Sequence, residues 1–302
     1  MTRRNVLILV VAMCWSHLFA GNYSGKLTIA TYNIRLQTPV DSGARSWVNR
    51  KADVARIIKK YDFDIFGVEE VGNKNQEADL KALIPDYNYF GKGRDNQAGT
   101  DGEQIGLFYK TKRFLAKEKG SFFLSETPEV MSKGWDAAYR RMCVWIRFQD
   151  SITKAEFFVF CSHFDHMGVK ARVESARLIE QRVKKIASGK PVLFLGDLNT
   201  APDETDMYKI LRADFDDSRE ISVKSAVGST GTFNDFDVSK TLLPVSERID
   251  YIFCKKMKVF SYRVISDRFS DKTYPSDHFP VMIECTINHS LLIKYELTPI
   301  ST

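Results

Sequence analysis

The chain has 302 residues, of which 44% are hydrophobic and 27% charged, and its formal net charge at pH 7 is +6. This composition is ordinary for a globular protein and excludes intrinsic disorder and a coiled coil, because each of these requires a shifted composition. The small positive surplus is compatible with an anionic substrate, but it is far below the charge of a protein dedicated to binding duplex DNA.

The N-terminus has the features of a secretory signal peptide. Arg3 and Arg4 form a short basic region, and the apolar run at positions 6–19 that follows is too short for a typical membrane span. Small residues at positions 20 and 21 provide an acceptable cleavage site. We therefore expect residues 1–20 to be removed and the mature protein to be exported to the periplasm or the extracellular space, with no membrane span left. The alternative is that this segment forms a buried first strand or helix.

Beyond the leader, apolar runs typical of strands alternate with amphipathic stretches, without repeats and without a linker rich in proline or serine. We therefore treat residues 21–287 as one domain and residues 288–302 as a C-terminal tail. The apolar runs predict strands at 27–34, 64–70, 104–110, 120–124, 142–149, 156–163, 191–197, 248–254, 258–266 and 279–287.

Apolar residues at helical spacing predict helices at Ser46–Tyr61 and Val169–Ala187, and a shorter helix is expected after Pro202. The glycine-rich stretch Gly91–Gly102 is expected to be a mobile loop. Some strands follow one another directly and others are separated by helices, which favours two packed sheets flanked by helices over one doubly wound sheet.

Four cysteines remain after the leader, and three pairings of them are formally open in an exported protein. Each one lies inside an apolar, strand-like run, where free cysteine behaves as a small hydrophobic residue. A chain of this length does not need disulfides for stability. We therefore expect buried free thiols at Cys143, Cys161, Cys254 and Cys285.

Many of the predicted strands end in, or begin just after, an acidic, amide or imidazole side chain. A carboxylate beside a dry strand is costly unless it is paired, hydrogen-bonded or bound to a metal. Because several sheet edges deliver such groups, we expect them to converge on one site, and this pattern is typical of metal-assisted hydrolysis. In chain order the residues are Asn33, Glu70, Glu103, His163, Asp197, Asn199, Asp250, Asp277 and His278.

Taken in this order, these residues resemble the endonuclease/exonuclease/phosphatase superfamily, which has the deoxyribonuclease-I-like fold, and within it the secreted bacterial members. The resemblance covers essentially the whole mature domain. It implies an α/β protein of the α+β type, a four-layer sandwich in which two packed mixed sheets are flanked by helices. Its most specific segments are Thr31-Tyr32-Asn33-Ile34-Arg35, Gly196-Asp197-Leu198-Asn199, Arg248-Ile249-Asp250-Tyr251 and Ser276-Asp277-His278-Phe279-Pro280.

Hydrolysis of a phosphate ester needs charge neutralised on the phosphoryl oxygens, an aligned water and a stabilised leaving oxygen. Glu70 offers the hard oxygen donor that Mg²⁺ requires, and Mn²⁺ is a possible substitute. Asp277 is the expected second carboxylate near the metal. Asn33 is expected to contribute an amide oxygen or to orient Glu70. Glu69 is not the expected ligand, because the resemblance places Glu70 at the family's ligand position and a strand directs neighbouring side chains to opposite faces.

The resemblance assigns Asp197 to the attacking water and Asn199 to the phosphate. Two positions apart on an extended segment, these side chains are expected to face the same way. Asp250 is expected to orient His278 and to favour its charged form, and the role of base stays shared between Asp197 and His278.

On the other side of the expected site, His163 is expected to pair with Glu103 and to assist at the phosphate or the leaving group. Arg141 matches a position that contacts phosphate in some relatives, and the alternative for it is a surface charge on an edge strand. Asp165 and His166 are expected in a loop near the site, where His166 could touch substrate.

Each of these residues has an ordinary structural role open to it when it is taken alone: Asn33 could cap a turn, and a histidine could be hydrogen-bonded in the core. The histidines argue against chance, because three of the five, His163, His166 and His278, fall in two of the motifs.

Two other interpretations stay open. The segment from Cys161 to His166 is one residue away from a signature of binuclear zinc hydrolases, and zinc accepts thiolate, imidazole and carboxylate ligands. Too few histidines follow it in the sequence to complete such a site. The second alternative is a secreted binding module that keeps the fold without the chemistry.

The substrate is left open among nucleic acid, a phospholipid headgroup and a sugar or inositol phosphate, and the protein is expected to be a monomer that loses activity in EDTA. Phe233 and Trp135 could each stack on a substrate or simply pack a loop. Basic residues that could serve a polyanion are available at Lys92, Arg94, Lys110, Lys112, Arg113, Arg140 and Arg141.

Overall fold

The protein is described by a computed structural model that covers residues 25–288. The predicted leader, residues 1–20, and the tail after residue 288 lie outside the described residues. Among residues 25–288, no helix combines the length and the apolar character that a membrane crossing requires.

Within residues 25–288, twelve strands form two mixed sheets of six strands each. The first sheet has the order β11-β12-β1-β2-β4-β3, and the second has the order β5-β6-β7-β8-β10-β9. The strands are β1 (Leu27–Asn33), β2 (Ile65–Val71), β3 (Tyr87–Gly93), β4 (Gln104–Lys110), β5 (Phe114–Phe123), β6 (Met142–Asp150), β7 (Glu156–His163), β8 (Val192–Asp197), β9 (Asp216–Asp217), β10 (Asp250–Lys255), β11 (Met257–Val264) and β12 (Val281–Ile287).

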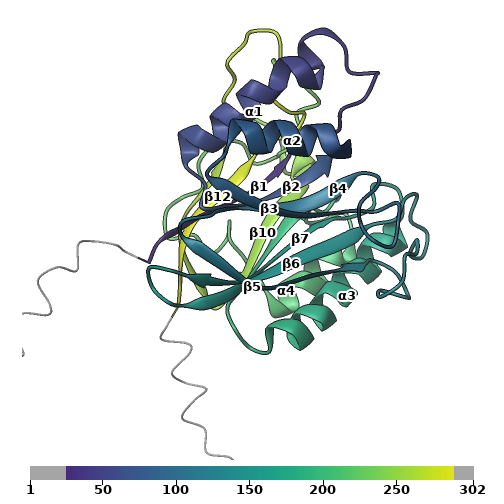
Figure 1. The fold of residues 1–302 in the computed structure, drawn as a ribbon, viewed down its shortest axis with the longest axis vertical. Coiled ribbons are helices and arrows are strands. Elements are labelled where there is room, and N and C mark those ends of the chain that lie inside the picture. Colours follow the sequence, from purple (N-terminus) through teal and green to yellow (C-terminus); the bar gives the residue numbers. More distant parts are fainter. Residues whose placement is uncertain (1–24, 289–302) are drawn as a thin grey trace, which may run out of the picture.

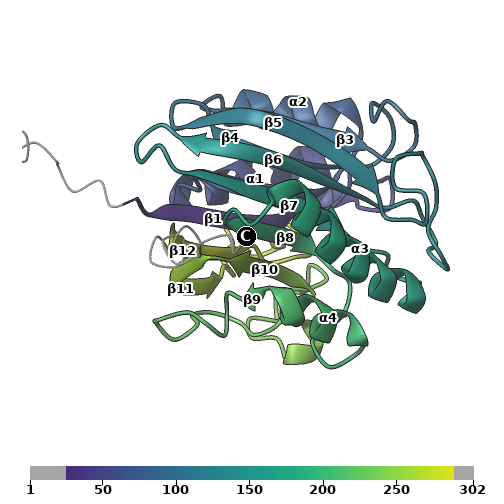
Figure 2. The same ribbon diagram turned by 90° about the horizontal axis from the view of Figure 1, so that it is seen from below.

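The helices cover the outer faces of the two sheets, so that the molecule has four layers (Figures 1 and 2). Helices α1 and α2 lie on the first sheet, and α3 and α4 lie on the second. The helices are α1 (Trp47–Tyr61), α2 (Asn73–Leu83), α3 (Val169–Ala187) and α4 (Asp206–Asp214), with 3₁₀ turns η1 (Gly43–Arg45) and η2 (Val245–Glu247).

The alternation of side chains along each strand explains how one chain forms three hydrophobic cores, one between the sheets and one between each sheet and its helices. In β7, Val159 and Cys161 point into the core between the sheets, whereas Phe158 and Phe160 pack against the helices on the outside. Both faces of this strand are therefore dry, which is why its sequence is a continuous apolar run.

The predicted four-layer fold is confirmed, with local differences from the predicted elements. The sequence did not predict β3 or α2, and β5 begins earlier than the predicted start at residue 120. Gly91–Gly93 belong to strand β3, so the loop expected at Gly91–Gly102 is shorter than predicted. The four cysteines Cys143, Cys161, Cys254 and Cys285 are buried free thiols, as expected.

Candidate active site

The strand topology brings the polar strand ends together at one end of the sandwich. Strands β1 and β2 are parallel, and so are β7 and β8, so their carboxyl ends lie at the same edge of each sheet. The strands β4, β6, β10 and β12 run antiparallel to these neighbours, so the residues that precede them arrive at the same end. This arrangement places Asn33, Glu70, Glu103, Arg141, His163, Asp197, Asp250, Asp277 and His278 around one site.

Asn33, at the end of β1, connects the two sheets through its side-chain amide. Its Nδ2 donates to Glu70 Oε1 at 3.1 Å and to Asp197 Oδ2 at 3.0 Å. Its Oδ1 accepts a hydrogen bond from the backbone N–H of Arg35 at 3.0 Å. In this structure Asn33 therefore orients Glu70, one of its two expected roles, while its amide oxygen is occupied by the backbone.

Glu70 lies at an irregular point of β2, where the pairing with β4 shifts register between Val68 and Val71. Its φ is +58°, in the left-handed region that residues other than glycine rarely adopt. Its Oε2 accepts from the backbone N–H of Leu36 at 3.0 Å. Burial acts to raise the pKa of the Glu70 carboxyl, but the Leu36 N–H and the charge of His278 hold it below its ordinary value.

Glu69 points the other way, into the space between the sheets, as the alternation of a strand predicts. Its Oε1 accepts from Thr31 Oγ1 at 2.8 Å and from Cys161 Sγ at 3.2 Å. Its Oε2 is buried without a hydrogen-bond partner among the described residues. Burial raises the pKa of Glu69 to about 8, so it is protonated near neutral pH, and its Oε1 already accepts from two protein donors.

Asp197 ends β8 and is almost fully buried. The preceding Gly196 has a φ of +151°, and a side chain at this position would meet the carbonyl oxygen of Ser162 at 1.9 Å. The chain then turns, because the N–H of Asn199 donates to Asp197 Oδ1 at 2.9 Å and Asn199 has a φ of +51°. Both side chains reach His163 Nε2, so they face the same way as predicted, but a turn rather than an extended segment directs them there.

His278 and Asp250 form the expected carboxylate–imidazole pair, with Nδ1 at 2.9 Å from Oδ2. The Nε2 atom of His278 lies 3.8 Å from Asp197 Oδ2. Burial acts to lower the pKa of His278, but Asp250 and Asp197 raise it well above its ordinary value, so the ring is an imidazolium. Phe233 lies edge-on against this ring, with the centroids 5.1 Å apart, so it forms part of the site wall.

His163 lies on the opposite side of Asp197 and has the opposite charge state. Its Nε2 is 3.3 Å from Asp197 Oδ2 and 2.9 Å from Asn199 Nδ2, whereas its Nδ1 is 3.5 Å from Glu103 Oε1. Burial and the Arg141 guanidinium lower the pKa of His163 to about 3, so the ring is neutral. The expected contact with Glu103 is present, but the contacts with Asn199 and Asp197 are shorter.

The carboxylates of Glu70 and Asp277, which are oxygen donors suitable for a hard cation, lie next to Asp197 and the two histidines. Burial and the nearby Glu70 carboxylate raise the pKa of Asp277 to about 6, against the positive charges of His278 and Arg35. Two neighbouring carboxylates that repel each other in this way are stabilised by a cation. Arg35 Nη1 is 3.7 Å from Asp277 Oδ2, a contact that the position of Arg35 in its motif does not predict.

A second set of possible ligands overlaps the site. Among residues 25–288, Asp197, Asp250 and His278 are the group of three ligating side chains whose donor atoms lie within 4.8 Å of one another. His278 and Asp250 are already bonded to each other, and magnesium prefers oxygen to imidazole nitrogen. For a hard cation the carboxylates of Glu70 and Asp277 are therefore the better donors.

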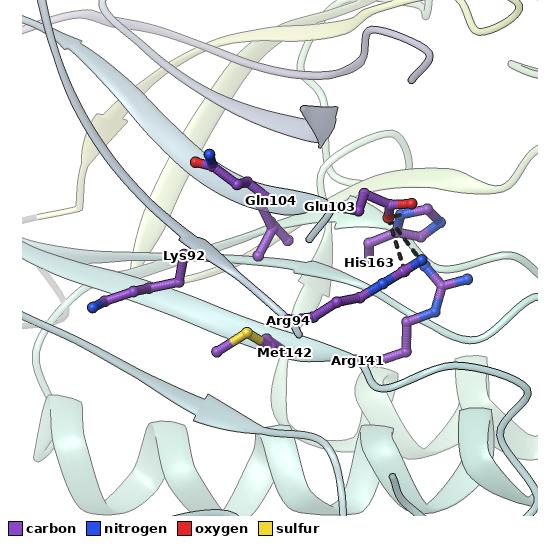
Figure 3. A pocket seen from close by; sticks show the side chains of 8 residues that line it. Lys92, Arg94, Glu103, Gln104, Arg141, Met142 and His163 are labelled. Carbon is purple, nitrogen blue, oxygen red and sulfur yellow. Dashed lines mark hydrogen bonds and ion pairs between the residues drawn. The ribbon is translucent and has the colours of Figure 1, made fainter. Parts of the chain in front are cut away.

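Arg141, Arg94 and His163 converge on the carboxylate of Glu103 and line a pocket beside the site (Figure 3). Arg94 Nη1 is 2.9 Å from Glu103 Oε1, and Arg141 Nη1 is 3.7 Å from the same oxygen. Arg141 is buried, and its Nη1 has no hydrogen-bond partner within the part of the chain that the structure describes. Arg94 pairs with Glu103, and Arg141 pairs with Asp165 as well as Glu103, so the free donor here is the buried Nη1 of Arg141.

The alternative zinc site is not assembled. The thiol of Cys161 is buried between the sheets against Glu69, whereas His166 is exposed at the rim of the site. Asp165 bonds to backbone N–H groups and to Arg141 instead. No group of metal-ligating side chains that contains Cys161 or His166 occurs within residues 25–288.

Solved structures with related sequences share this fold. A mannosyl-6-phosphatase of Bacteroides thetaiotaomicron, Bt3783, is 38% identical, with a TM-score of 0.80 over 86% of this chain and 100% of the other. An endonuclease/exonuclease/phosphatase of Bacteroides vulgatus is 32% identical, with a TM-score of 0.80 over 87% of this chain and 99% of the other.

A more distant relative is an uncharacterized protein, R895, of Acanthamoeba polyphaga mimivirus, which is 23% identical over 184 residues. The matched part covers 51% of this chain and 26% of the viral protein, so the chain spans about a quarter of that relative.

The sequence also matches the Endonuclease/Exonuclease/phosphatase family over residues 30–278. This range begins inside β1 and ends at His278, so it contains every residue of the site described above. The chain therefore belongs to the endonuclease/exonuclease/phosphatase family.

Proposed function

We propose that the protein is an exported, Mg²⁺-dependent phosphatase that hydrolyses sugar phosphates by attack of water on phosphorus. The observation that carries the reaction is the buried Asp197 carboxylate, which lies between a charged His278 and a neutral His163 and is held by Asn33. The substrate class is supported by the relative that is 38% identical and is a mannosyl-6-phosphatase. The buried Nη1 donor of Arg141, which has no hydrogen-bond partner among residues 25–288, suits a compact anion.

The residues fit a magnesium ion at Glu70 and Asp277, because both present hard oxygen donors and lie close enough for their charges to repel each other. When bound, the ion would neutralise charge on the phosphoryl oxygens and the leaving oxygen. Asn33 holds the Glu70 carboxylate in place through its amide N–H. The turn after Asp197 and the irregularity in β2 fix these groups without a flexible loop.

Asp197 orients the attacking water and accepts its proton. Burial and the neighbouring Asp250 raise the pKa of Asp197, which makes the carboxylate a stronger base than an exposed aspartate. The imidazolium of His278 supplies positive charge where negative charge builds up on the phosphoryl group. Asn199 and His163, whose side-chain nitrogens lie 2.9 Å apart, provide polar groups on the side of Asp197 away from His278.

Activity against a panel of phosphate esters tests this proposal. Mannose 6-phosphate, p-nitrophenyl phosphate, bis-p-nitrophenyl phosphate, sphingomyelin, DNA and RNA are each incubated with the mature chain and Mg²⁺. We expect the sugar phosphate to be hydrolysed, with activity lost in excess EDTA and restored by Mg²⁺. In Asp197→Asn and His278→Gln we expect kcat to fall at least about 100-fold, because a general base and a charge stabiliser are each worth roughly this factor.

The outcomes separate the two parts of the proposal. Cleavage of DNA or of the diester without turnover of sugar phosphate would replace the substrate class. Hydrolysis that persists in excess EDTA would overturn the metal-dependent mechanism, and the absence of turnover on every ester would favour a non-catalytic binding module.

A further inference from the structure

We propose that Tyr139 and His166, together with Arg94, form a rigid wall that receives the sugar ring of the substrate beside His163. The inference rests on the proposed function, because it names the part of the site that would distinguish a sugar phosphate from other esters. None of the catalytic steps described above uses these three side chains.

The three side chains lie against one another at the rim of the site. The guanidinium carbon of Arg94 lies 4.9 Å from the ring centroid of Tyr139. The rings of Tyr139 and His166 are stacked, with centroids 5.7 Å apart and an interplanar angle of 18°. The wall therefore consists of three flat groups that come from separate loops of the chain.

Arg141 and Glu103 connect this wall to the catalytic groups. Arg141 Nη2 lies 3.3 Å from His166 Nδ1, and its Nη1 lies 3.7 Å from Glu103 Oε1. The same carboxylate is 2.9 Å from Arg94 and 3.5 Å from His163 Nδ1 (Figure 3). A phosphate held at His163 and Arg141 would therefore place its ester group next to the wall.

The buried Asp165 carboxylate fixes the backbone on both sides of the stack. Its oxygens accept hydrogen bonds from the N–H groups of Ala138 at 3.0 Å, Tyr139 at 3.2 Å and Gly168 at 2.8 Å. Burial acts to raise the pKa of Asp165, but these N–H groups and Arg141 hold it well below its ordinary value, so the carboxylate is charged.

A second carboxylate, Asp136, ties the same loop to the start of α3 through the N–H of Ala171 at 2.6 Å. Tyr139 is nevertheless 53% exposed. An exposed aromatic residue on so well anchored a loop is arranged for contact rather than for the core.

The chemistry of the wall suits a ring that carries hydroxyl groups. Arg94 and His166 already lie against the Tyr139 ring, which leaves less of the ring for a nucleobase to stack on, so the hydroxyl is the group that a ligand would contact. The Tyr139 hydroxyl makes no hydrogen bond to the described residues, and His166 keeps a second polar ring atom at the surface. Such donors and acceptors match sugar hydroxyls, whereas they give no advantage to an aromatic leaving group.

Kinetics with two monoesters and one nucleotide ester test the wall. We expect Tyr139→Ala and His166→Ala each to raise KM for mannose 6-phosphate about tenfold, the effect of losing one well-placed hydrogen bond. The kcat is expected to change less than about twofold, because neither side chain contacts the reacting atoms. For p-nitrophenyl phosphate, the kcat and KM of both variants are expected to stay within about twofold of those of the unmutated protein. Leu115→Ala, at an exposed residue at the start of β5, is the control, and its kcat and KM for both monoesters are expected to stay within the same limits.

Tyr139→Phe separates the hydroxyl from the ring, because it keeps the stack and removes the polar atom. A KM for mannose 6-phosphate close to that of Tyr139→Ala is expected. The proposal of a sugar subsite would be overturned if the substitutions raised KM equally for both monoesters or for neither. It would also be overturned if they raised KM equally for thymidine 5′-p-nitrophenyl phosphate.

Binding measured in the Asp197→Asn background keeps this test independent of turnover. Titration calorimetry with mannose 6-phosphate is expected to show weaker binding when Tyr139→Ala is added to Asp197→Asn. Unchanged binding in the double variant would contradict the wall even if the protein is a phosphatase. Failure of the proposed function would instead appear as absent turnover in the unmutated protein.

Discussion

Two imidazoles lie on either side of the Asp197 carboxylate, and their surroundings give them opposite charges. His278 bonds to Asp250 and stays protonated, whereas His163 lies near Arg141 and stays neutral. Burial alone acts in the same direction on both rings, so the difference comes from the neighbouring charges. At the scale of single residues, the charge of each imidazole is therefore set by the charged groups beside it.

Glu69 gives a pH-dependent prediction at this scale. The pKa of its carboxyl is about 8 in the folded protein, against an ordinary value of 4.5. The folded state thus binds more protons than the unfolded state between these values, so Glu69 costs stability as the pH rises from about 4.5 to about 8. In Glu69→Gln, which keeps the oxygen that accepts from Thr31 and Cys161, we expect this loss to disappear.

Urea unfolding of both proteins at pH 5 and at pH 8 measures the effect. The free energy of unfolding of Glu69→Gln is expected to exceed that of the unmutated protein by a few kcal/mol at pH 8, with a much smaller difference at pH 5. Glu118→Gln, an exposed glutamate of β5, is the control and is expected to show no such trend. A difference that is the same at the two pH values would contradict the assignment.

At the scale of elements, the site depends on places where regular structure is interrupted. Glu70 lies at the irregularity of β2, and Asn199 lies in the turn that closes on Asp197. The close approach of β7 and β8 at Gly196 belongs to the same group of features, because a side chain there has no room. These features aim side chains that a regular strand would send to another face.

A glycine substitution tests the close approach of β7 and β8. In Gly196→Ala the new methyl group would meet the backbone of Ser162, so we expect a loss of at least about 3 kcal/mol in the free energy of unfolding. Gly189→Ala is the matched control, because Gly189 also has a positive φ, +80°, but its Cβ would have no neighbour within 4 Å. We expect this control to lose about 1 kcal/mol. Similar losses in the two variants would show that the backbone conformation alone matters.

The four-layer fold and the members of the site could be predicted from the sequence, because polar side chains at the ends of dry strands are costly unless they share a site. Strand β3 could not be predicted, since its residues are only partly buried and carry no clear alternation. The turn that joins Asp197 to Asn199 was also beyond prediction, because it depends on a local hydrogen bond that spacing does not reveal. Nothing in the sequence indicated the proposed role of Tyr139, because that role depends on its contacts with Arg94 and His166, which are distant in the sequence.

At the scale of the whole molecule, the site joins the two sheets. Asn33 and Glu70 belong to the first sheet and Asp197 and His163 to the second, so the hydrogen bond from Asn33 to Asp197 crosses between them. Arg248, two residues before Asp250, forms a buried ion pair at 2.7 Å with Asp217 of β9. The geometry of the site therefore depends on the packing of both sheets.

Metal binding is expected to stabilise the whole fold. At a Mg²⁺ concentration of about 100 times Kd, binding to the folded state alone adds about 2.7 kcal/mol, and each kcal/mol raises Tm by roughly 2–4 °C in a chain of this size. Thermal unfolding with Mg²⁺ and with EDTA measures this shift.

Glu70→Gln is expected to lose most of the shift, whereas Asp203→Asn, at an exposed position, is expected to keep it. A Tm that is the same in Mg²⁺ and in EDTA would contradict the proposed ligands.

The order of the strands has a consequence for the timing of biosynthesis. The second sheet is built from one continuous stretch of chain, β5 to β10, whereas the first sheet needs β1 to β4 together with β11 and β12. Asp277 and His278 come immediately before β12, so a ribosome must deliver nearly the entire domain before either residue can meet Asn33 or Asp197. A copy that ends before Asp277 would lack two residues of the site and the strand that joins β11 to β1, so we expect hydrolytic activity only after β12 has paired with β1.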